Sequence, residues 1–570
     1  MVLGQATSLR IFSHPTNHKQ LSSVQRGIEM TSRLCEKYSS NHDNLANYAV
    51  GVTREEKTIP GITSSDFHTE TDKIKIALIG GLSDDPKSEK SLGESIDNLL
   101  DDQANFTFIS TYLGDVRNEI SSAIYPPGEK YYFDETAQEA LYLWRWLTIN
   151  GPDLIVEIFT SDIPSIQTYG LSKNFQHDTI KTQNVESDQS LLGAIASGLG
   201  DTPGNIPSIR INCTASNAKS VVGDILQWIK SQSFPHSPAR KELDNRSSRN
   251  PLEVARVLDP VYGHKLDEPI GYVQGVAVSG RLRLKQLDPT HNDPTQEISA
   301  MVDFLNTDEG YNGNATKGNS IAALCWAEEL FEATGEDKWK TLLLKAADTY
   351  QETLPGEAPT PCDPNFWCED MFFMSAILGR AHQLTGKSTY ADMLIKFLFD
   401  ANVQQADGLF WHSKSGPFFW GRGNGFGCMA YAETLTYLSS DHPEREKLLG
   451  IHKNQLAGLI KRQGTSGMWT QLLDFPGTYE EFSSTCMIGY SMARGINNGW
   501  LKKNDYKDSV LKAWNAVNRR ISSNADLVDV CTGTGVQEKR SDYLYRAAVN
   551  GYDDRGGSMA FWFSTEMARL

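Results

Sequence analysis

The sequence predicts a two-part chain, in which an α/β layer is followed by an all-helical (α/α)6 barrel. Short β-rich runs alternate with helical patterns between about residues 73 and 230, as expected for helices covering a mostly parallel sheet. After Gly271 a loose repeat of paired helices replaces this pattern. The chain of 570 residues is also too long for a single hydrophobic core.

Composition narrows the class of protein. A hydrophobic content of 39% and a charged content of 22% are typical of a soluble globular protein. The net charge of −17 argues against nucleic acid or an anionic membrane as the main partner. Because there is no long apolar run and no apolar N-terminal segment, we expect no membrane span, no signal peptide and a cytoplasmic location. The eight cysteines lack a metal-ligand spacing, so we expect free thiols, no metal and no cofactor.

The first part of the chain has the following expected elements. Residues 1 to about 70 are polar and predict irregular structure. Beyond them we expect strands at 73–81, 106–110, 153–159 and 208–213, an amphipathic helix at 135–149 and a helix at 221–230. Pro, Ser and alternating charge from 231 to about 265 indicate an exposed connector. The predicted domains are an α/β domain over 1–240, a linker over 241–270 and a helical domain over 271–570.

This first part resembles the zinc carboxypeptidase-like (succinylglutamate desuccinylase-like) fold. The residues that carry the resemblance are IALIGGLSDD, PPGEKYYFDETAQEALYLWRWL and PDLIVEIF. In that family a loop carries His and Glu zinc ligands roughly where Ser83 and Pro86 stand, and a later strand ends in a ligand His where Phe159 stands. None of these three residues can hold zinc. The resemblance therefore implies a scaffold or recognition module without a metal.

The second part contains a repeated helical hairpin. Units begin near Ala322, Phe372, Met429 and Met487, with i, i+3, i+4 apolar spacing and breaks every fifty to sixty residues or so. The first helix of each unit is rich in small and apolar residues, and the second carries more charge. About six such hairpins with an apolar inner helix favour a closed barrel over an open solenoid.

Unusual residues gather in the loops before the expected inner helices. These loops are 312–318, 365–374, 410–427, 467–484 and 531–535. All lie at the same end of their hairpins, so a closed barrel brings them around one opening. Concave sites edged by aromatic side chains with a few polar groups are the usual ligand sites. We therefore predict a ligand site at this end of the barrel.

With these loops in view, residues 271–570 resemble glycoside hydrolase families 88 and 105, the unsaturated glucuronyl and unsaturated rhamnogalacturonyl hydrolases. The matching motifs are EDMFFM, GLFWH, WGRGNG, MWTQLLD, CTGTG and DDRGGSMAF. The resemblance implies an (α/α)6 barrel without a metal. It also implies a substrate, an oligosaccharide ending in a 4,5-unsaturated uronic acid, and a reaction, hydration of the double bond that a polysaccharide lyase leaves.

Asp370 matches the catalytic acid and base of these families. The substrate ring is a vinyl ether, and one carboxyl group can protonate it and then assist the attack of water. Asp370 stands among Phe366, Trp367, Met371 and Phe372, where desolvation is expected to raise its pKa. The structural alternative is an Asp that caps the helix starting near Met371.

The predicted substrate-binding residues are polar or aromatic side chains in the same loops. His412 and Arg422 could bind a carboxylate or hydroxyl, and Trp420 and Trp469 could stack on a sugar ring. Asn314, Asn424 and Gln471 could hydrogen-bond to hydroxyls. For all of these residues a purely structural role is the alternative. The pair Glu480 and Glu481 indicates a solvated turn.

One departure from the family pattern leaves alternatives open. These families carry a second Asp near the position of NGNATKG, where this chain has Asn312 and Asn314. An Asn can position a hydroxyl or a water molecule, but it cannot raise the pKa of Asp370 by charge repulsion. The chain could therefore act on saturated uronides as a glycosidase, lyase or epimerase, or be a carbohydrate-binding pseudoenzyme. The polysaccharide and the oligomeric state stay open.

Overall fold

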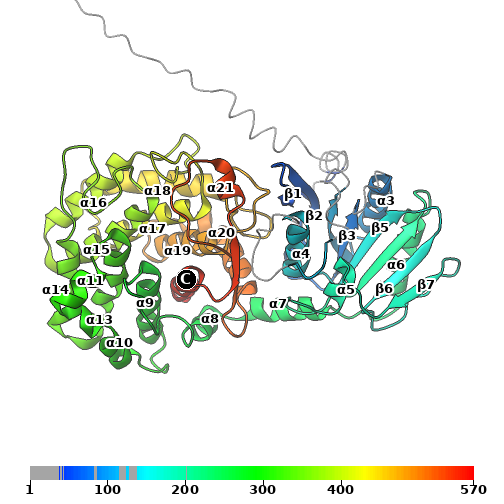
Figure 1. The fold of residues 1–570 in the computed structure, drawn as a ribbon, viewed down its shortest axis with the longest axis horizontal. Coiled ribbons are helices and arrows are strands. Elements are labelled where there is room, and N and C mark those ends of the chain that lie inside the picture. The colour runs from blue at the N-terminus through cyan, green and yellow to red at the C-terminus, as the bar shows by residue number, and fades with distance from the viewer. Residues whose placement is uncertain are drawn as a thin grey trace, which may run out of the picture.

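The computed structural model describes residues 38, 42, 44–81, 87–113, 123–127, 138–200 and 202–570. Within these residues the chain forms two bodies that lie side by side, an α/β domain and a helical barrel (Figure 1). Helix α7 (Pro238–Ser248) runs from one to the other (Figure 1). The first part of the chain thus contains a mixed sheet and the second part a helical barrel, as the predicted fold class has it. The predicted domain bounds stay a prediction.

The α/β domain contains one mixed sheet. Its eight described strands have the order β1-β2-β4-β3-β5-β8-β6-β7. The central pairs β4–β3, β3–β5 and β5–β8 are parallel, and β1–β2, β2–β4 and β6–β8 are antiparallel. The bounds are β1 Leu45–Val52, β2 Thr58–Ser64, β3 Ile74–Gly80, β4 Phe106–Tyr112, β5 Leu154–Thr160, β6 Ser165–Tyr169, β7 Thr182–Val185 and β8 Ser208–Cys213.

Side-chain alternation along the strands divides the core into two layers. In β3, Ala77 and Ile79 point to one face of the sheet, and Ile76 and Leu78 point to the other. The first face is covered by α4 (Gln138–Asn150) and α5 (Leu191–Ala196), and the second by α3 (Ser88–Asp101) and α6 (Ala218–Lys230). The sheet is thus buried on both faces, as in other sheets with parallel centres.

Four of the strands were predicted, and the others were not. The runs at 73–81, 106–110, 153–159 and 208–213 form β3, β4, β5 and β8. The irregular structure expected up to residue 70 is wrong for β1 and β2. Pro60 and Gly61 weaken the strand pattern of β2 in the sequence, but β2 forms because it pairs with β1 on one side and with β4 on the other. Ser83 and Pro86 lie outside the described residues, and Phe159 lies in β5.

Helix α4 is not amphipathic, contrary to the prediction for 135–149. Every residue from Gln138 to Thr148 is buried. The helix lies between the sheet and the barrel (Figure 1), and its apolar residues belong to one hydrophobic cluster with those of the barrel. A helix placed between two bodies is buried on all sides, and its few charged residues, such as Arg145, are buried as well. The two bodies therefore share a core instead of being joined only by a linker.

The barrel consists of an inner ring of helices. Each inner helix contacts the next, and the last contacts the first, so the ring closes. The ring is formed by α9 Tyr272–Leu287, the continuous run α12 Gly318–Ala322, η2 Ala323–Trp326 and α13 Ala327–Thr334, then α15 Cys368–Thr385, α17 Gly421–Tyr437, α19 Phe482–Asn497 and α22 Asp554–Met567. The predicted closed barrel of hairpins is confirmed.

Outer helices cover the ring. They are α10 Thr295–Val302, α14 Asp337–Ala347, α16 Ser388–Ala401, α18 Arg445–Ile460, α20 Lys503–Arg519 and α8 Pro251–Leu258. Helix α8 packs on α22, so the connector expected at 231–265 is helical, and part of it belongs to the barrel. Shorter elements are η1 Asp303–Asn306, α11 Asp308–Asn314, α21 Arg540–Leu544 and the hairpin of β9 Leu527–Cys531 with β10 Ala548–Gly551. Among the described helices, none has the length and apolar character needed to cross a membrane.

Candidate active site

The inner helices begin next to one another at one end of the barrel, which we call the mouth. At the starts of α9 and α12, the amide of Tyr272 donates to Oδ1 of Asn319 at 3.0 Å. Between the starts of α17 and α19, Arg422 donates to Oγ of Ser483 at 3.3 Å. The loops predicted to gather around one opening therefore do so.

Asp370 lies in the first turn of α15, at the mouth. Its side chain does not cap the helix, which begins after Trp367 without a side-chain cap. Instead Oδ2 accepts a hydrogen bond from the amide of Asp363 at 2.8 Å. A Cβ atom at Gly318 would lie 2.9 Å from Oδ1, so only a glycine leaves room for this carboxyl group. Asp370 is 7% exposed, and burial raises its pKa to about 7, where the charge of Glu369 acts in the same direction.

A hydrogen-bonded chain of three side chains runs beside Asp370. Nε2 of His412 lies 3.0 Å from both carboxylate oxygens of Glu369, and Nδ1 lies 2.6 Å from the hydroxyl of Tyr543. That hydroxyl accepts the amide hydrogen of Gln537 at 2.9 Å. We assign its own proton to Nδ1 of His412, which leaves Nε2–H to donate to Glu369. His412 is fully buried, so its partners are these protein groups.

Arg422 holds the loop that follows β9. Its Nη1 donates to the carbonyl oxygen of Cys531 and its Nη2 to that of Thr532, both at 2.6 Å. The guanidinium also lies over the ring of Trp420, 4.7 Å from its centroid. Arg422 is only 2% exposed, and its described contacts hold the loop after β9 against the start of α17. A direct contact with substrate stays a prediction.

Three predicted ligand residues each keep a buried polar atom without a hydrogen-bond partner among the described residues. These atoms are Oδ1 of Asn314, Nε1 of Trp420 and Oε1 of Gln471. Trp420 lies against His412, with ring centroids 4.4 Å apart. The Nδ2 atom of Asn314 donates to Gly310, and Nε2 of Gln471 donates to Tyr543. Buried polar atoms are normally paired, and these three belong to a larger set of unpaired buried atoms among the described residues.

Two other predicted ligand residues belong to the framework. Oδ1 of Asn424 accepts from the amide of Phe410, and its Nδ2 donates to the carbonyl oxygens of Phe410 and Trp420. Nε1 of Trp469 donates to the carbonyl oxygen of Leu459 at 2.7 Å. Neither side chain is exposed or has an unpaired polar atom. These contacts are those of supporting residues, and a contact of Asn424 or Trp469 with substrate stays a prediction.

Glu481 is not part of a solvated turn, as the sequence suggested. It is fully buried and caps α19, where it accepts from the amides of Ser483 and Ser484. It also accepts from the amide of Cys531 at 2.9 Å. Glu480 is partly exposed and pairs with Arg520. The predicted exposure to solvent therefore holds in part for Glu480 and is wrong for Glu481.

Sequence reasoning missed Glu369, Tyr543 and Tyr272. Tyr272 starts α9 and packs against Phe373 and Phe426, and burial raises its pKa to about 12. Glu369 stands directly before Asp370 in the motif EDMFFM, and this position could have indicated that it belongs to the site. Tyr543 has no such signal, because it is 131 residues from His412 in the chain.

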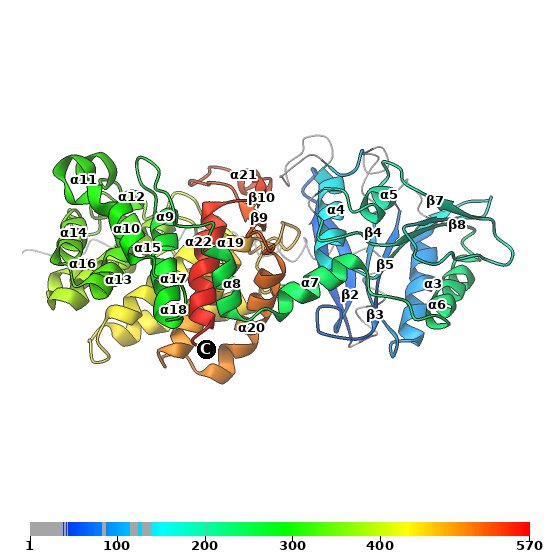
Figure 2. The ribbon, with the colours of Figure 1, turned by 90° about the horizontal axis from the view of Figure 1, so that it is seen from below.

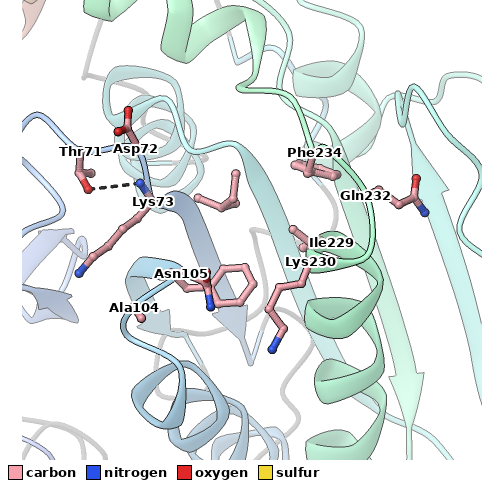
Figure 3. A pocket seen from close by; sticks show the side chains of 11 residues that line it. Thr71, Asp72, Lys73, Ala104, Asn105, Ile229, Lys230, Gln232 and Phe234 are labelled. Carbon is pink, nitrogen blue, oxygen red and sulfur yellow. Dashed lines mark hydrogen bonds between the residues drawn. The ribbon is translucent and has the colours of Figure 1, made fainter.

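In the described part of the α/β domain there is a hollow and no cluster of metal-ligating side chains. Among the described residues, no group of three or more His, Cys, Asp or Glu side chains could hold a metal ion. A hollow of about 500 Å³ lies where β3 and β4 begin, next to the end of α6 (Figure 3). Both lysines that line it, Lys73 and Lys230, are paired with carboxylates, Asp66 and Asp102 respectively. The predicted catalytic residue, Asp370, lies instead at the mouth of the barrel.

A comparison with protein families identifies the barrel. The model of glycosyl hydrolase family 88 matches residues 252–570. The chain belongs to glycosyl hydrolase family 88. The family match begins inside α8, within the expected linker, which agrees with the packing of α8 on the barrel. The family predicted from the motifs is thus confirmed, and the chain carries a glycoside hydrolase domain.

Individual proteins are similar to parts of the chain. An unsaturated 3S-rhamnoglycuronyl hydrolase of Alteromonas sp. (strain LOR) is 33% identical over 110 residues, which cover 19% of this chain and 27% of that protein. A protein of the same name from Formosa agariphila is 27% identical over 172 residues, covering 27% and 46%. The chain thus aligns with less than half of either relative. A family 105 glycoside hydrolase of C. acetobutylicum ATCC 824 has the same barrel fold, with a TM-score of 0.50, 18% identity, and coverage of 56% of this chain and 99% of that one.

Proposed function

We propose that the chain removes a 4,5-unsaturated uronic acid from the end of lyase-generated oligosaccharides, by hydration of the C4–C5 double bond. The observation that carries this proposal is the buried carboxyl group of Asp370 at the mouth of a family 88 barrel, with a pKa raised to about 7. A carboxyl group with that pKa is partly protonated at neutral pH and can give a proton to carbon. The relatives named as unsaturated rhamnoglycuronyl hydrolases support the substrate class.

The reaction follows from the chemistry of the vinyl ether. Asp370 gives its proton to C4, and the electron pair of the double bond forms the new C–H bond. The resulting oxocarbenium-like centre at C5 is captured by water, and the carboxylate of Asp370 accepts the proton that water loses. The hemiketal at C5 then opens by cleavage of its bond to the ring oxygen. The hemiacetal left at C1 breaks down to an aldehyde and releases the rest of the oligosaccharide as an alcohol.

Neighbouring groups have supporting roles in this proposal. The carboxylate of Glu369 favours the protonated form of Asp370 before the reaction. The unpaired atoms of Asn314, Trp420 and Gln471 are suited to sugar hydroxyls or to the attacking water. Since Asn314 stands near the position of the family's second Asp, we assign it to neutral positioning. The glycosidase pair of two carboxyl groups at a fixed separation is not required, because one carboxyl group serves as acid and then as base.

For the first domain we propose a carboxypeptidase-like fold without peptidase chemistry. Its eight-stranded mixed sheet with helices on both faces supports this fold. Phe159, at the strand end where the family has a ligand His, packs under the guanidinium of Arg210. Such an apolar side chain cannot bind zinc. The domain is then a structural partner of the barrel.

The proposal is tested with a panel of lyase-generated unsaturated disaccharides and their saturated counterparts. We expect wild-type protein to convert at least one unsaturated disaccharide to a 4-deoxy-5-keto acid and a free sugar, with the uptake of one water molecule measured by mass spectrometry. Cleavage of only the saturated disaccharides would indicate glycosidase chemistry instead. Binding without any turnover would indicate a carbohydrate-binding pseudoenzyme.

A further inference from the structure

Residues 527–551, which we call the mouth segment, touch the active site on one side. The segment contains β9, α21 and β10. Its residues Cys531 and Thr532 receive the two 2.6 Å hydrogen bonds of Arg422, and its Tyr543 lies 2.6 Å from Nδ1 of His412. The mouth segment therefore supplies one of the contacts that hold the ring of His412, the partner of Glu369.

The other side of the mouth segment touches the α/β domain. Arg145, on the barrel-facing helix α4 (Figure 2), places Nη2 2.8 Å from Oδ1 of Asp529 in β9. The same Nη2 donates to Oδ1 of Asn550 in β10 at 3.0 Å. The hydroxyl of Tyr545 lies 3.0 Å from the carbonyl oxygen of Thr53. One arginine of the first domain thus binds both strands of the hairpin at the same point.

The backbone of Asp529 depends on these contacts. Its φ angle is +67°, in the left-handed region that non-glycine residues seldom adopt. The amide of Asp529 donates to Oδ1 of Asn550 at 3.0 Å, the atom that Arg145 also binds. The other cation near its carboxylate is Arg520, whose Nε lies 3.8 Å from Oδ2. Strained conformations of this kind persist where the surroundings fix them.

We propose that Arg145 is a positioning residue, through which the α/β domain holds the mouth segment, and with it His412 and Arg422, in the catalytic arrangement. The Arg145 and Asp529 side chains are 6% and 1% exposed. Without Arg145, the buried carboxylate of Asp529 keeps only the more distant Arg520, at 3.8 Å, among the cations paired with it in the described residues. The hydrogen bond to Asn550 is lost as well, so the hairpin would shift toward water. Cys531, which accepts from Arg422, is only two residues beyond Asp529. The first domain is then required for turnover, although it contains none of the catalytic groups.

The loss of Arg145 alone should not separate the two bodies. Gly51 of β1 lies against the ring of Tyr142 and against Gly477 of the barrel, where added Cβ atoms would clash. This contact and the shared apolar core keep the domain in place. A variant at Arg145 therefore tests the position of the mouth segment and not the association of the domains.

The test compares full-length wild type with Arg145→Met and Arg145→Lys by hydrogen exchange. The control is Asp244→Asn, which removes the charge of a half-exposed carboxylate on α7 that lies 3.2 Å from Arg519 of α20 and 3.3 Å from Arg240. We expect amide exchange in residues 527–551 to be more than tenfold faster in Arg145→Met, with a smaller change in Arg145→Lys and none in Asp244→Asn. Helices α14 and α16, on the far side of the barrel, should exchange as in wild type.

The activity arm rests on the proposed function. On an unsaturated disaccharide, kcat of folded Arg145→Met should fall more than tenfold at a temperature well below unfolding, and Arg145→Lys should recover part of it. Unchanged exchange in 527–551, acceleration spread evenly over the chain, or a loosened segment with unchanged kcat would each overturn the proposal. If wild type turns over no substrate, the proposed function fails, and the exchange arm still decides whether Arg145 holds the segment.

Discussion

Nε2 of His412 lies 3.0 Å from each carboxylate oxygen of Glu369, the residue directly before Asp370. Two adjacent carboxyl groups in the first turn of α15 thus have different environments. Glu369 has a histidine as its partner, whereas Asp370 accepts one backbone hydrogen bond and lies against Gly318. Environments that separate the protonation of two carboxyl groups are a common way to assign an acid. This difference supports Asp370 as the proton donor.

Asp370→Asn should abolish most of the turnover without unfolding the protein. Asn keeps the size of the side chain and can still accept from the amide of Asp363, but it cannot give a proton to carbon. We expect kcat to fall by about 10²- to 10⁴-fold, measured from initial rates, with an unchanged circular dichroism spectrum. Equal rates in wild type and variant would remove Asp370 from the mechanism.

Glu369→Gln should move the pH profile of kcat/KM to lower pH. The protonated form of Asp370 is the active form, so the rate falls as the pH rises through its pKa of about 7. Removing the charge of Glu369 lowers that pKa, and the alkaline limb moves with it. Tyr543→Phe is the control, because it breaks the contact with His412 but leaves the charge. If Glu369→Gln has the same pH profile of kcat/KM as wild type, the assignment of the alkaline limb to Asp370 is contradicted.

The stability of Asp370→Asn relative to wild type should depend on pH. The folded state raises the pKa of Asp370 from about 4 in the unfolded chain to about 7, so it binds the proton more tightly. The stability that this binding gives is complete below about pH 4 and is lost as the pH rises to 7, by at most about 1.4 kcal/mol per pH unit. The free energy of unfolding of the variant, measured with urea, should therefore increase relative to that of wild type as the pH rises from 4 to 7. A constant difference would show that the carboxyl group titrates normally.

Gly318→Ala should reduce activity by displacing Asp370. The new Cβ atom would lie 2.9 Å from Oδ1, closer than non-bonded atoms approach, so the carboxyl group must move. We expect a decrease in kcat of more than tenfold with little change in melting temperature. The matched control is Gly313→Ala, where nothing lies within 4 Å of the new atom. Equal activity in both variants would mean that the position of Asp370 is not critical.

Arg422→Lys should lower stability. A lysine cannot reach the carbonyl oxygens of Cys531 and Thr532 at once, and charge-assisted bonds of this kind contribute about 2 kcal/mol. We expect a lower free energy of unfolding, measured with urea, together with lower kcat. A variant with wild-type stability and only a higher KM would instead favour the direct substrate contact predicted for Arg422.

The repeat pattern was sufficient to predict the barrel, but the site was only partly predictable. Asp370 and His412 stand in local motifs that sequence shows directly. Tyr543 reaches His412 only because the chain folds back across the mouth, and no spacing encodes that contact. Helix α4 was predicted to be amphipathic, with one face in water. The barrel covers that face, and the local sequence pattern does not contain this tertiary contact. The substrate contacts of Asn424 and Trp469 stay predictions, because ligand residues and framework residues in such loops have the same composition.

The most direct test of the central claim is the ultraviolet absorbance of the C4–C5 double bond during incubation with an unsaturated disaccharide. Wild-type protein should remove this absorbance completely and in proportion to enzyme concentration, while Asp370→Asn leaves it almost unchanged over the same time. Release of free sugar with the absorbance retained, or loss of absorbance at the same rate in both proteins, would contradict hydration by Asp370.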